Sequence, residues 1–155
     1  VMLLMTVAAY AQSGKSLYNK YSDSNGVSAV YISPAMFRMI GQLPNLDVKA
    51  SDGEKVDIAP LIRSFEGFYL LDVSDKSQAA SLRQEVQTMI KSGRFEVLME
   101  AKDSGSTMKI YTVGDDKVIS SLVMLAHEGD SVQFICLEGT INRKDFESLI
   151  AKSIK

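Results

Sequence analysis

Few residues of this chain have the types and the spacing that a catalytic or phosphate-binding site requires. Ser-Gly-Lys-Ser at 13–16 resembles the end of a phosphate-binding loop, but that motif needs a glycine five residues before Gly14, where the chain has Ala9. The single histidine, His127, lies in the stretch His-Glu-Gly-Asp, for which we expect a solvated turn. No Gly-x-Ser-x-Gly nucleophile motif is present. The sequence therefore predicts no catalytic residue.

Metal ligands and reactive thiols are equally scarce. One histidine and one cysteine cannot supply the three or four protein ligands of a zinc site. Asp-Ser-Asn-Gly at 23–26 lacks the later carboxylates of a calcium-binding loop and is better explained as a turn. Cys136 has apolar neighbours, which predict a buried, unreactive thiol. We therefore expect no metal and no cofactor.

Composition excludes some classes of partner. The 155 residues are enough for one domain with a real core, and 46% hydrophobic with 23% charged residues is ordinary for a globular protein. The net charge is −2 and the basic residues are scattered along the chain. Neither a nucleic-acid surface nor a polybasic membrane patch is therefore expected.

The first eleven residues carry no charge. This run is too short for a transmembrane helix, and it ends in Ala9-Tyr10-Ala11, a pattern that signal peptidases prefer. We expect residues 1–11 to be a signal peptide without its basic n-region, cleaved after Ala11, with 12–155 forming a single domain. After this cleavage the mature chain would be periplasmic or secreted, with no stable membrane span. The alternative is that residues 1–11 form a buried N-terminal element of the fold.

Turn and capping signals divide the rest of the chain into elements. Ser33-Pro34 and Asp75 are typical helix starts, and Gly41 and Gly93 typical helix ends. A last helix begins after Asn142 and has Phe146, Leu149 and Ile150 as its predicted apolar stripe. The segments predicted as helices are 16–23, 34–41, 57–65 and 75–93, and those predicted as strands are 27–32, 67–73, 94–102, 107–113, 117–126 and 131–138. Residues 42–56 are expected to be a disordered linker or to contain a short edge strand.

The order of these elements predicts the fold class. From residue 67 onward it is strand, helix, four strands joined by hairpins, and helix, which indicates an α+β fold. We expect an antiparallel sheet with a four-strand meander and helices packed mainly on one face. The N-terminal helix, strand and helix should pack on the same sheet or extend its edge. The strand 94–102 alternates apolar and charged residues, which predicts that it is half-buried.

The last three predicted strands are apolar on both faces, so the second face needs a cover. This cover could be residues 14–66 of the chain itself, a second subunit or an external ligand. We expect one face to contact the helices, with Met108, Ile110, Leu122, Met124, Val132 and Phe134. The other, with Ile135 and Leu137, is the candidate binding face, and its candidate binding residues are Tyr111, Val113, Ile119, Val123 and Leu125.

Two motifs carry a resemblance to a known family. The first is V-x-x-V-x-I-S-x-x-M, at Val27, Val30, Ile32, Ser33 and Met36, and the second is L-x-G-x-I, at Leu137, Gly139 and Ile141. The chain resembles the exported proteins of Bacteroides and its relatives that are catalogued as domain of unknown function four-two-five-two. The resemblance implies export to the cell envelope, with a hint of envelope sensing, and no assigned chemistry. Many members carry a lipobox cysteine, which this chain lacks.

These observations favour one function over two alternatives. We expect an exported cell-envelope protein that is a non-catalytic binding or sensing module. Its partner would be another envelope protein, or a second copy of the chain, bound through the sheet. The alternatives are a hydrolytic enzyme with a non-obvious carboxylate and serine site, and a subunit of a secreted assembly.

Overall fold

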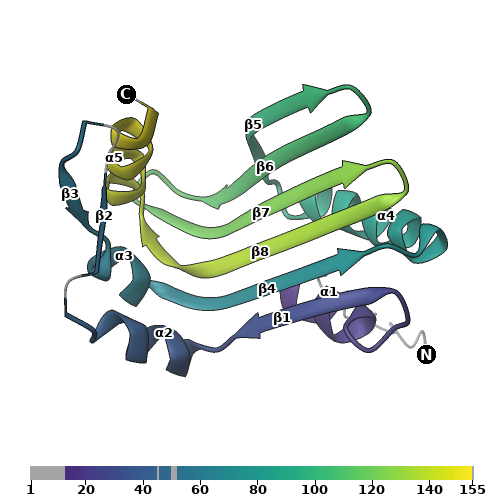
Figure 1. Ribbon diagram of the computed structural model, residues 1–155, viewed down its shortest axis with the longest axis horizontal. Coiled ribbons are helices and arrows are strands. Elements are labelled where there is room, and N and C mark those ends of the chain that lie inside the picture. The colour runs from purple at the N-terminus through teal and green to yellow at the C-terminus, as the bar shows by residue number, and fades with distance from the viewer. Residues whose placement is uncertain (1–12, 45, 50–51, 155) are drawn as a thin grey trace, which may run out of the picture.

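The chain folds around one six-stranded antiparallel sheet (Figure 1). The computed structural model describes residues 13–44, 46–49 and 52–154, so the predicted leader at 1–11 lies outside the described residues. The elements are α1 (Gly14–Tyr21), β1 (Val27–Ile32), α2 (Pro34–Gly41), β2 (Asp47–Lys49), β3 (Lys55–Asp57), α3 (Ala59–Arg63), β4 (Phe65–Val73), α4 (Lys76–Ser92), β5 (Glu96–Asp103), β6 (Ser106–Gly114), β7 (Val118–Glu128), β8 (Ser131–Asn142) and α5 (Arg143–Ile154).

The strands of the main sheet follow the order β1-β4-β8-β7-β6-β5. Strands β5 to β8 form the predicted meander, β4 pairs with β8, and β1 extends the sheet beyond β4. A separate small hairpin, β2 with β3, lies in the region predicted as a disordered linker or a short edge strand. The α+β class and the antiparallel meander are therefore confirmed.

The helix starts predicted from the sequence are made by side-chain caps. Ser33 Oγ accepts a hydrogen bond from the backbone N–H of Met36 at 3.2 Å, and Pro34 follows as the first helical residue. Asp75 Oδ1 accepts one from the N–H of Gln78 at 2.9 Å. Each cap satisfies one of the N–H groups that a helix start leaves without an intrahelical partner.

Helix α1 begins two residues before the predicted start at residue 16. Ser13 Oγ accepts a hydrogen bond from the N–H of Ser16 at 3.2 Å, and Ser16 Oγ accepts one from the N–H of Ser13 at 2.8 Å. This reciprocal cap fixes the start of the helix. The sequence Ser-Gly-Lys-Ser is thus a helix start.

Two tight turns set the register of the meander. Gly105 and Gly129 have φ of 88° and 57°, which glycine adopts at little cost, and each lies in a two-residue turn. Asp103 consequently pairs with Ser106, and Glu128 with Ser131. These pairs determine which side chains of the meander share a face.

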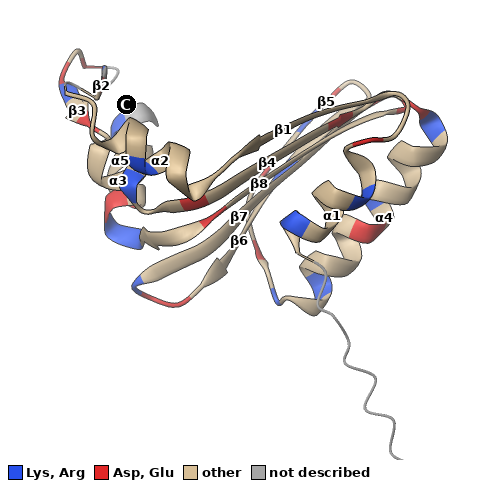
Figure 2. Ribbon diagram, turned by 90° about the horizontal axis from the view of Figure 1, so that it is seen from below, with Lys and Arg blue, Asp and Glu red and all other residues tan. Residues whose placement is uncertain are grey.

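Helices α1 and α4 cover one face of the sheet, and we call it the helix side. They lie behind the strands in Figure 1 and below them in Figure 2. Helices α2, α3 and α5 gather at the other end of the strands, and Figure 2 places them on the opposite side of the sheet. The core cluster on the helix side consists of Leu17, Tyr21, Tyr69, Leu71, Val73, Ala79, Leu82, Val86, Met89, Tyr111, Val123, Leu125, Val132, Phe134 and Cys136.

Two predictions about burial, one in strand β5 and one in helix α5, are wrong. All eight residues of β5 are exposed, although the alternation of 94–102 predicted a half-buried strand. β5 is an edge strand, and a register shift between Val97 and Met99 interrupts its alternation. In α5, Phe146 and Leu149 are half-buried, but Ile150 is 40% exposed and does not complete the predicted stripe.

Candidate binding face of the sheet

Three of the five candidate binding residues lie in the core instead of on an outer face. Tyr111, Val123 and Leu125 are 8%, 0% and 5% exposed and belong to the cluster that includes Leu82 and Val86 of α4. The prediction that these side chains face away from the helices is therefore wrong. Their binding role stays a prediction, but the side chains are enclosed by the chain's own helices.

The other two candidates lie near the end of the sheet from which α5 begins. Ile119 is 1% exposed and pairs with Ile141, which is fully buried. Val113 is half-buried and borders a polar cavity of about 250 Å³ together with Arg94 and Arg143. The register shifts at this end of both β6 and β7, which interrupts the simple alternation of faces. The structure does not bring the five candidates together on one surface.

Cross-strand pairing explains why side chains that were predicted to face away from the helices lie against them. Leu125 lies opposite Phe134, and Val123 opposite both Cys136 and Tyr111. Directly paired residues point to the same face. The side chains on the helix side are therefore those of Leu125, Phe134, Val123, Cys136 and Tyr111. Phe134 was predicted there, as was Val132, and both are buried. The sequence-based grouping had placed Phe134 and Leu125 on opposite faces.

The opposite face of the sheet, which we call the open face, is apolar across all six strands. Its side chains form two rows that run across the strands from one cross-strand partner to the next, and we call them the apolar rows. One row contains Ile32, Phe68, Leu137 and Leu122, and the other contains Val30, Leu70, Ile135, Met124, Ile110 and Met99.

The apolar rows are partly exposed along their whole length. Val30 and Met99, at the two ends of the longer row, are 46% and 44% exposed, and the residues between them are half-buried. Figure 1 views this face directly, and α2, α3 and α5 border it at one end only. Four of its residues, Met108, Ile110, Leu122 and Met124, were predicted to contact the helices, and that prediction is also wrong.

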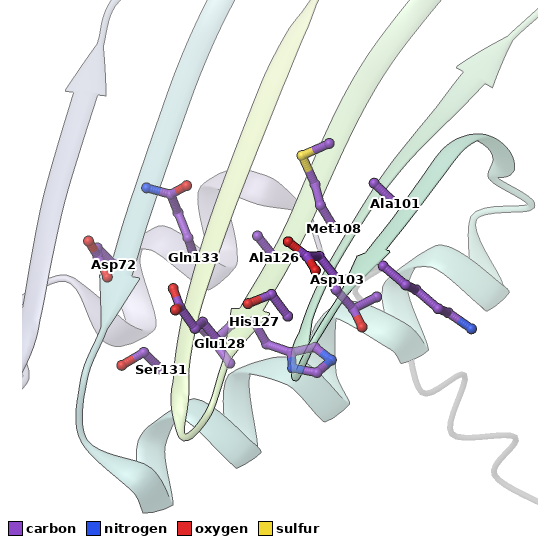
Figure 3. Close-up of a pocket in the computed structure, with 13 residues that line it drawn as sticks. Asp72, Ala101, Asp103, Met108, Ala126, His127, Glu128, Ser131 and Gln133 are labelled. Carbon is purple, nitrogen blue, oxygen red and sulfur yellow. The ribbon is translucent and has the colours of Figure 1, made fainter.

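Beyond the apolar rows, toward the hairpin tips, the open face becomes acidic. Asp72, Asp103 and Glu128 are exposed there, and we call these three residues the acidic end. Together with Ser131, Gln133, Met108 and Ala126 they line a shallow concavity of about 440 Å³ (Figure 3). A ligand on this face would therefore contact apolar side chains along the rows and carboxylates on the side nearest the acidic end.

Residues 21–149 match the family model described as Domain of unknown function (DUF4252). The chain belongs to this family. The matched range begins at the last residue of α1 and ends within α5, so it includes all six strands and both faces of the sheet. No curated protein and no solved structure matches the chain. The resemblance to domain of unknown function four-two-five-two is therefore confirmed.

His127 of this DUF4252 domain belongs to strand β7 and not to a turn. It pairs with Val132 and Thr107 on the helix side, and Figure 3 shows its ring directed toward α4. Burial lowers the pKa of its imidazole, and the positive charges of Arg83 and Lys109 lower it further. The predicted solvated turn residue is thus a half-buried residue with a preference for the neutral form.

Cys136 is buried, as predicted. It is 1% exposed, and burial raises the pKa of its thiol to about 12. The neighbouring Ser121 Oγ lies 3.6 Å from Sγ. Because the thiolate is the reactive form, a thiol with this pKa does not act as a nucleophile near neutral pH.

Within 13–44, 46–49 and 52–154, no group of three or more His, Cys, Asp or Glu side chains could hold a metal ion. None of the helices in these ranges is long and apolar enough to cross a membrane.

Proposed function

We propose that this DUF4252 domain is a non-catalytic binding module that binds a partner through the open face of its sheet. The observation that carries the proposal is the pair of apolar rows. The longer row crosses all six strands, and neither row has a helix over its middle. Contiguous apolar surface of this kind is rare on monomers and typical of interaction sites. Burying each half-exposed side chain would contribute on the order of 1 kcal/mol to binding.

The same proposal places the protein in the cell envelope. The uncharged segment 1–11, with Ala9-Tyr10-Ala11 at its end, supports export to the periplasm or beyond. The partner would then be another envelope protein, and binding would serve to sense or to assemble. Analysis of the mature protein by intact mass in its native host tests the export step, which requires loss of residues 1–11.

A charged substitution in the apolar rows tests the binding step. Met124 is half-buried in the middle of the longer row, and Gln87 is exposed on α4, on the far side of the sheet. Wild-type protein, Met124→Glu and the matched control Gln87→Glu are immobilised and exposed to the same envelope extract. We expect wild type and Gln87→Glu to retain the same protein in a fixed ratio, and Met124→Glu to lose it at least ten-fold. Equal retention by all three folded proteins would contradict the proposal.

A further inference from the structure

We infer that the occupant of the open face is an amphipathic helix of a partner protein, which lies across the strands and carries lysines or arginines along its flank nearest the acidic end. The inference rests on the proposed function and names the partner chemistry that this face would recognise. It follows from the shape of the apolar rows, from the charges around them and from the hydrogen-bonding needs of the ligand.

The shape of the apolar surface matches one face of a helix. The longer row crosses six strands, which at about 4.8 Å between neighbours span about 24 Å, and the shorter row crosses four of them. A helix rises about 1.5 Å per residue, so about 16 residues would cover this distance. On the four strands that carry both rows, the rows are two residues apart, or about 7 Å, which suits the apolar stripe of a single helix.

The charges of the sheet select a basic ligand. Lys102 and Lys109 are the two basic residues of the six strands, and both lie on the helix side, where each Nζ is within 4 Å of Glu100 Oε1, at 3.0 Å and 3.9 Å. The described strand side chains that point to the open face therefore contribute no positive charge, whereas the acidic end contributes three carboxylates. Lys102 also borders the concavity, but its ammonium group lies beside Glu100 on the helix side. A fourth carboxylate, Glu96, pairs with Thr112 at the other end of the face.

This distribution disfavours other apolar ligands. Anionic lipid headgroups, fatty-acid carboxylates and nucleic-acid phosphates would be repelled by the acidic end. A second copy of the chain would bring a second acidic end to the interface, although it would supply a matching apolar surface. A basic flank on the ligand gives complementary charge, which raises the association rate and fixes the orientation.

Backbone hydrogen bonding favours a helix over an extended peptide. An extended segment lying on the face of a sheet finds no backbone partners there, because the strands already pair with each other. Its N–H and C=O groups would then be desolvated without compensation. A helix satisfies these groups internally and presents only side chains, as α4 already does on the opposite side of the same sheet.

Two designed peptides test the inference directly. Both are fluorescein-labelled 18-residue helices with the same leucine stripe, and one carries lysines along its flank whereas the other carries glutamates. Fluorescence anisotropy with the full chain measures their affinities. We expect the lysine peptide to bind at least ten-fold more tightly than the glutamate peptide. Equal affinities would overturn the inference.

Charge reversal at the acidic end provides a second test of the inference with the same two peptides. In the double variant Asp72→Lys/Glu128→Lys we expect the lysine peptide to bind at least ten-fold more weakly and the glutamate peptide to gain affinity. The matched control is Asp52→Lys/Asp116→Lys, which changes two exposed turn carboxylates, one between β2 and β3 and one between β6 and β7. It should alter the affinity of the lysine peptide by less than two-fold, and an equal loss in both double variants would contradict the inference.

Failure of the inference can be separated from failure of the proposed function. If neither peptide binds but Met124→Glu abolishes a concentration-dependent dimer in light scattering, the open face binds a second copy and only the helix inference falls. If the lysine peptide binds Met124→Glu as tightly as wild type, the apolar rows are not its site. In that case both the inference and the proposed function are contradicted.

Discussion

Gly14 and Cys136 approach each other so closely that residue 14 has no room for a side chain. A Cβ atom on Gly14 would lie 2.5 Å from Cys136 Sγ and 2.7 Å from Cys136 Cβ. The first turn of α1 therefore packs directly on strand β8, on the helix side of the sheet. Because Cys136 is 1% exposed and enclosed by the core, its side chain cannot move aside at little cost.

This contact predicts that Gly14→Ala destabilises the domain despite the high helix propensity of alanine. Overpacking of a core typically costs about 1–3 kcal/mol, and we expect a loss in this range from urea unfolding. The control is Lys15→Ala, since Lys15 is the exposed neighbour in the same turn and should change stability by less than about 0.5 kcal/mol. A Gly14→Ala protein as stable as wild type would show that α1 is free to shift away from β8.

The second prediction compares two adjacent residues of β7. Val123 is fully buried beneath the helices, whereas Met124 is half-buried on the open face. Val123→Asp should destabilise the protein by more than about 4 kcal/mol, because an unpaired carboxylate would enter the core. Met124→Asp should cost no more than about 1 kcal/mol. Urea unfolding of both variants measures the difference, and the reverse order would mean that α1 and α4 cover the other face.

Local sequence signals account for most of the secondary structure. Ser33-Pro34, Asp75 and Asn142 each begin a helix as predicted, and β1 spans the predicted residues 27–32. These signals act within three or four residues of the chain, so they can be recognised without knowledge of the packing. The order of hairpins likewise predicts the meander.

The assignment of faces needed information of longer range. The strands of the meander are apolar on both faces, so alternation alone could not show which face receives α4. The two-residue turn at Gly129 and Asp130 does indicate that Leu125 and Phe134 are paired and share a face. This pairing can be inferred from the sequence, and it places Leu125 and Phe134 in the same group of core residues. The choice between the two faces depends on how α1 and α4 pack, which no local pattern encodes.

The third prediction concerns the buried thiol. The pKa of Cys136 in the folded chain, about 12, lies above its ordinary value of 9.0, so the unfolded chain releases this proton first as the pH rises. The stability that the neutral thiol contributes is therefore fully present below pH 9 and is lost as the pH rises toward 12. Burial also raises the pKa of Tyr69 from its ordinary 10.0 to about 12, which adds to the loss from pH 10 upward.

Two measurements check this account of the thiol. Between about pH 9 and pH 10, the free energy of unfolding should fall less steeply in Cys136→Ala than in wild type, because only wild type has the thiol to ionise. Iodoacetamide should modify wild type slowly at about pH 8 and rapidly once urea unfolds it. Rapid modification of the folded protein would mean that the thiol is accessible and that α1 does not seal it.

The last prediction concerns the open face in the absence of any partner. Nile red is apolar and uncharged, so the acidic end does not repel it, and the apolar rows should bind it in the folded protein. We expect blue-shifted, enhanced dye emission with wild type, and a several-fold weaker signal with Ile135→Asp, which places a carboxylate in the middle of the longer row. Gln87→Asp, which adds the same charge on the exposed surface of α4, should leave the signal unchanged. Cooperative urea unfolding of each protein ensures that the dye reports on a native surface and not on a loosened core. If the dye signal survives Ile135→Asp in a folded protein, the apolar rows are not the exposed apolar surface on which the proposed function depends.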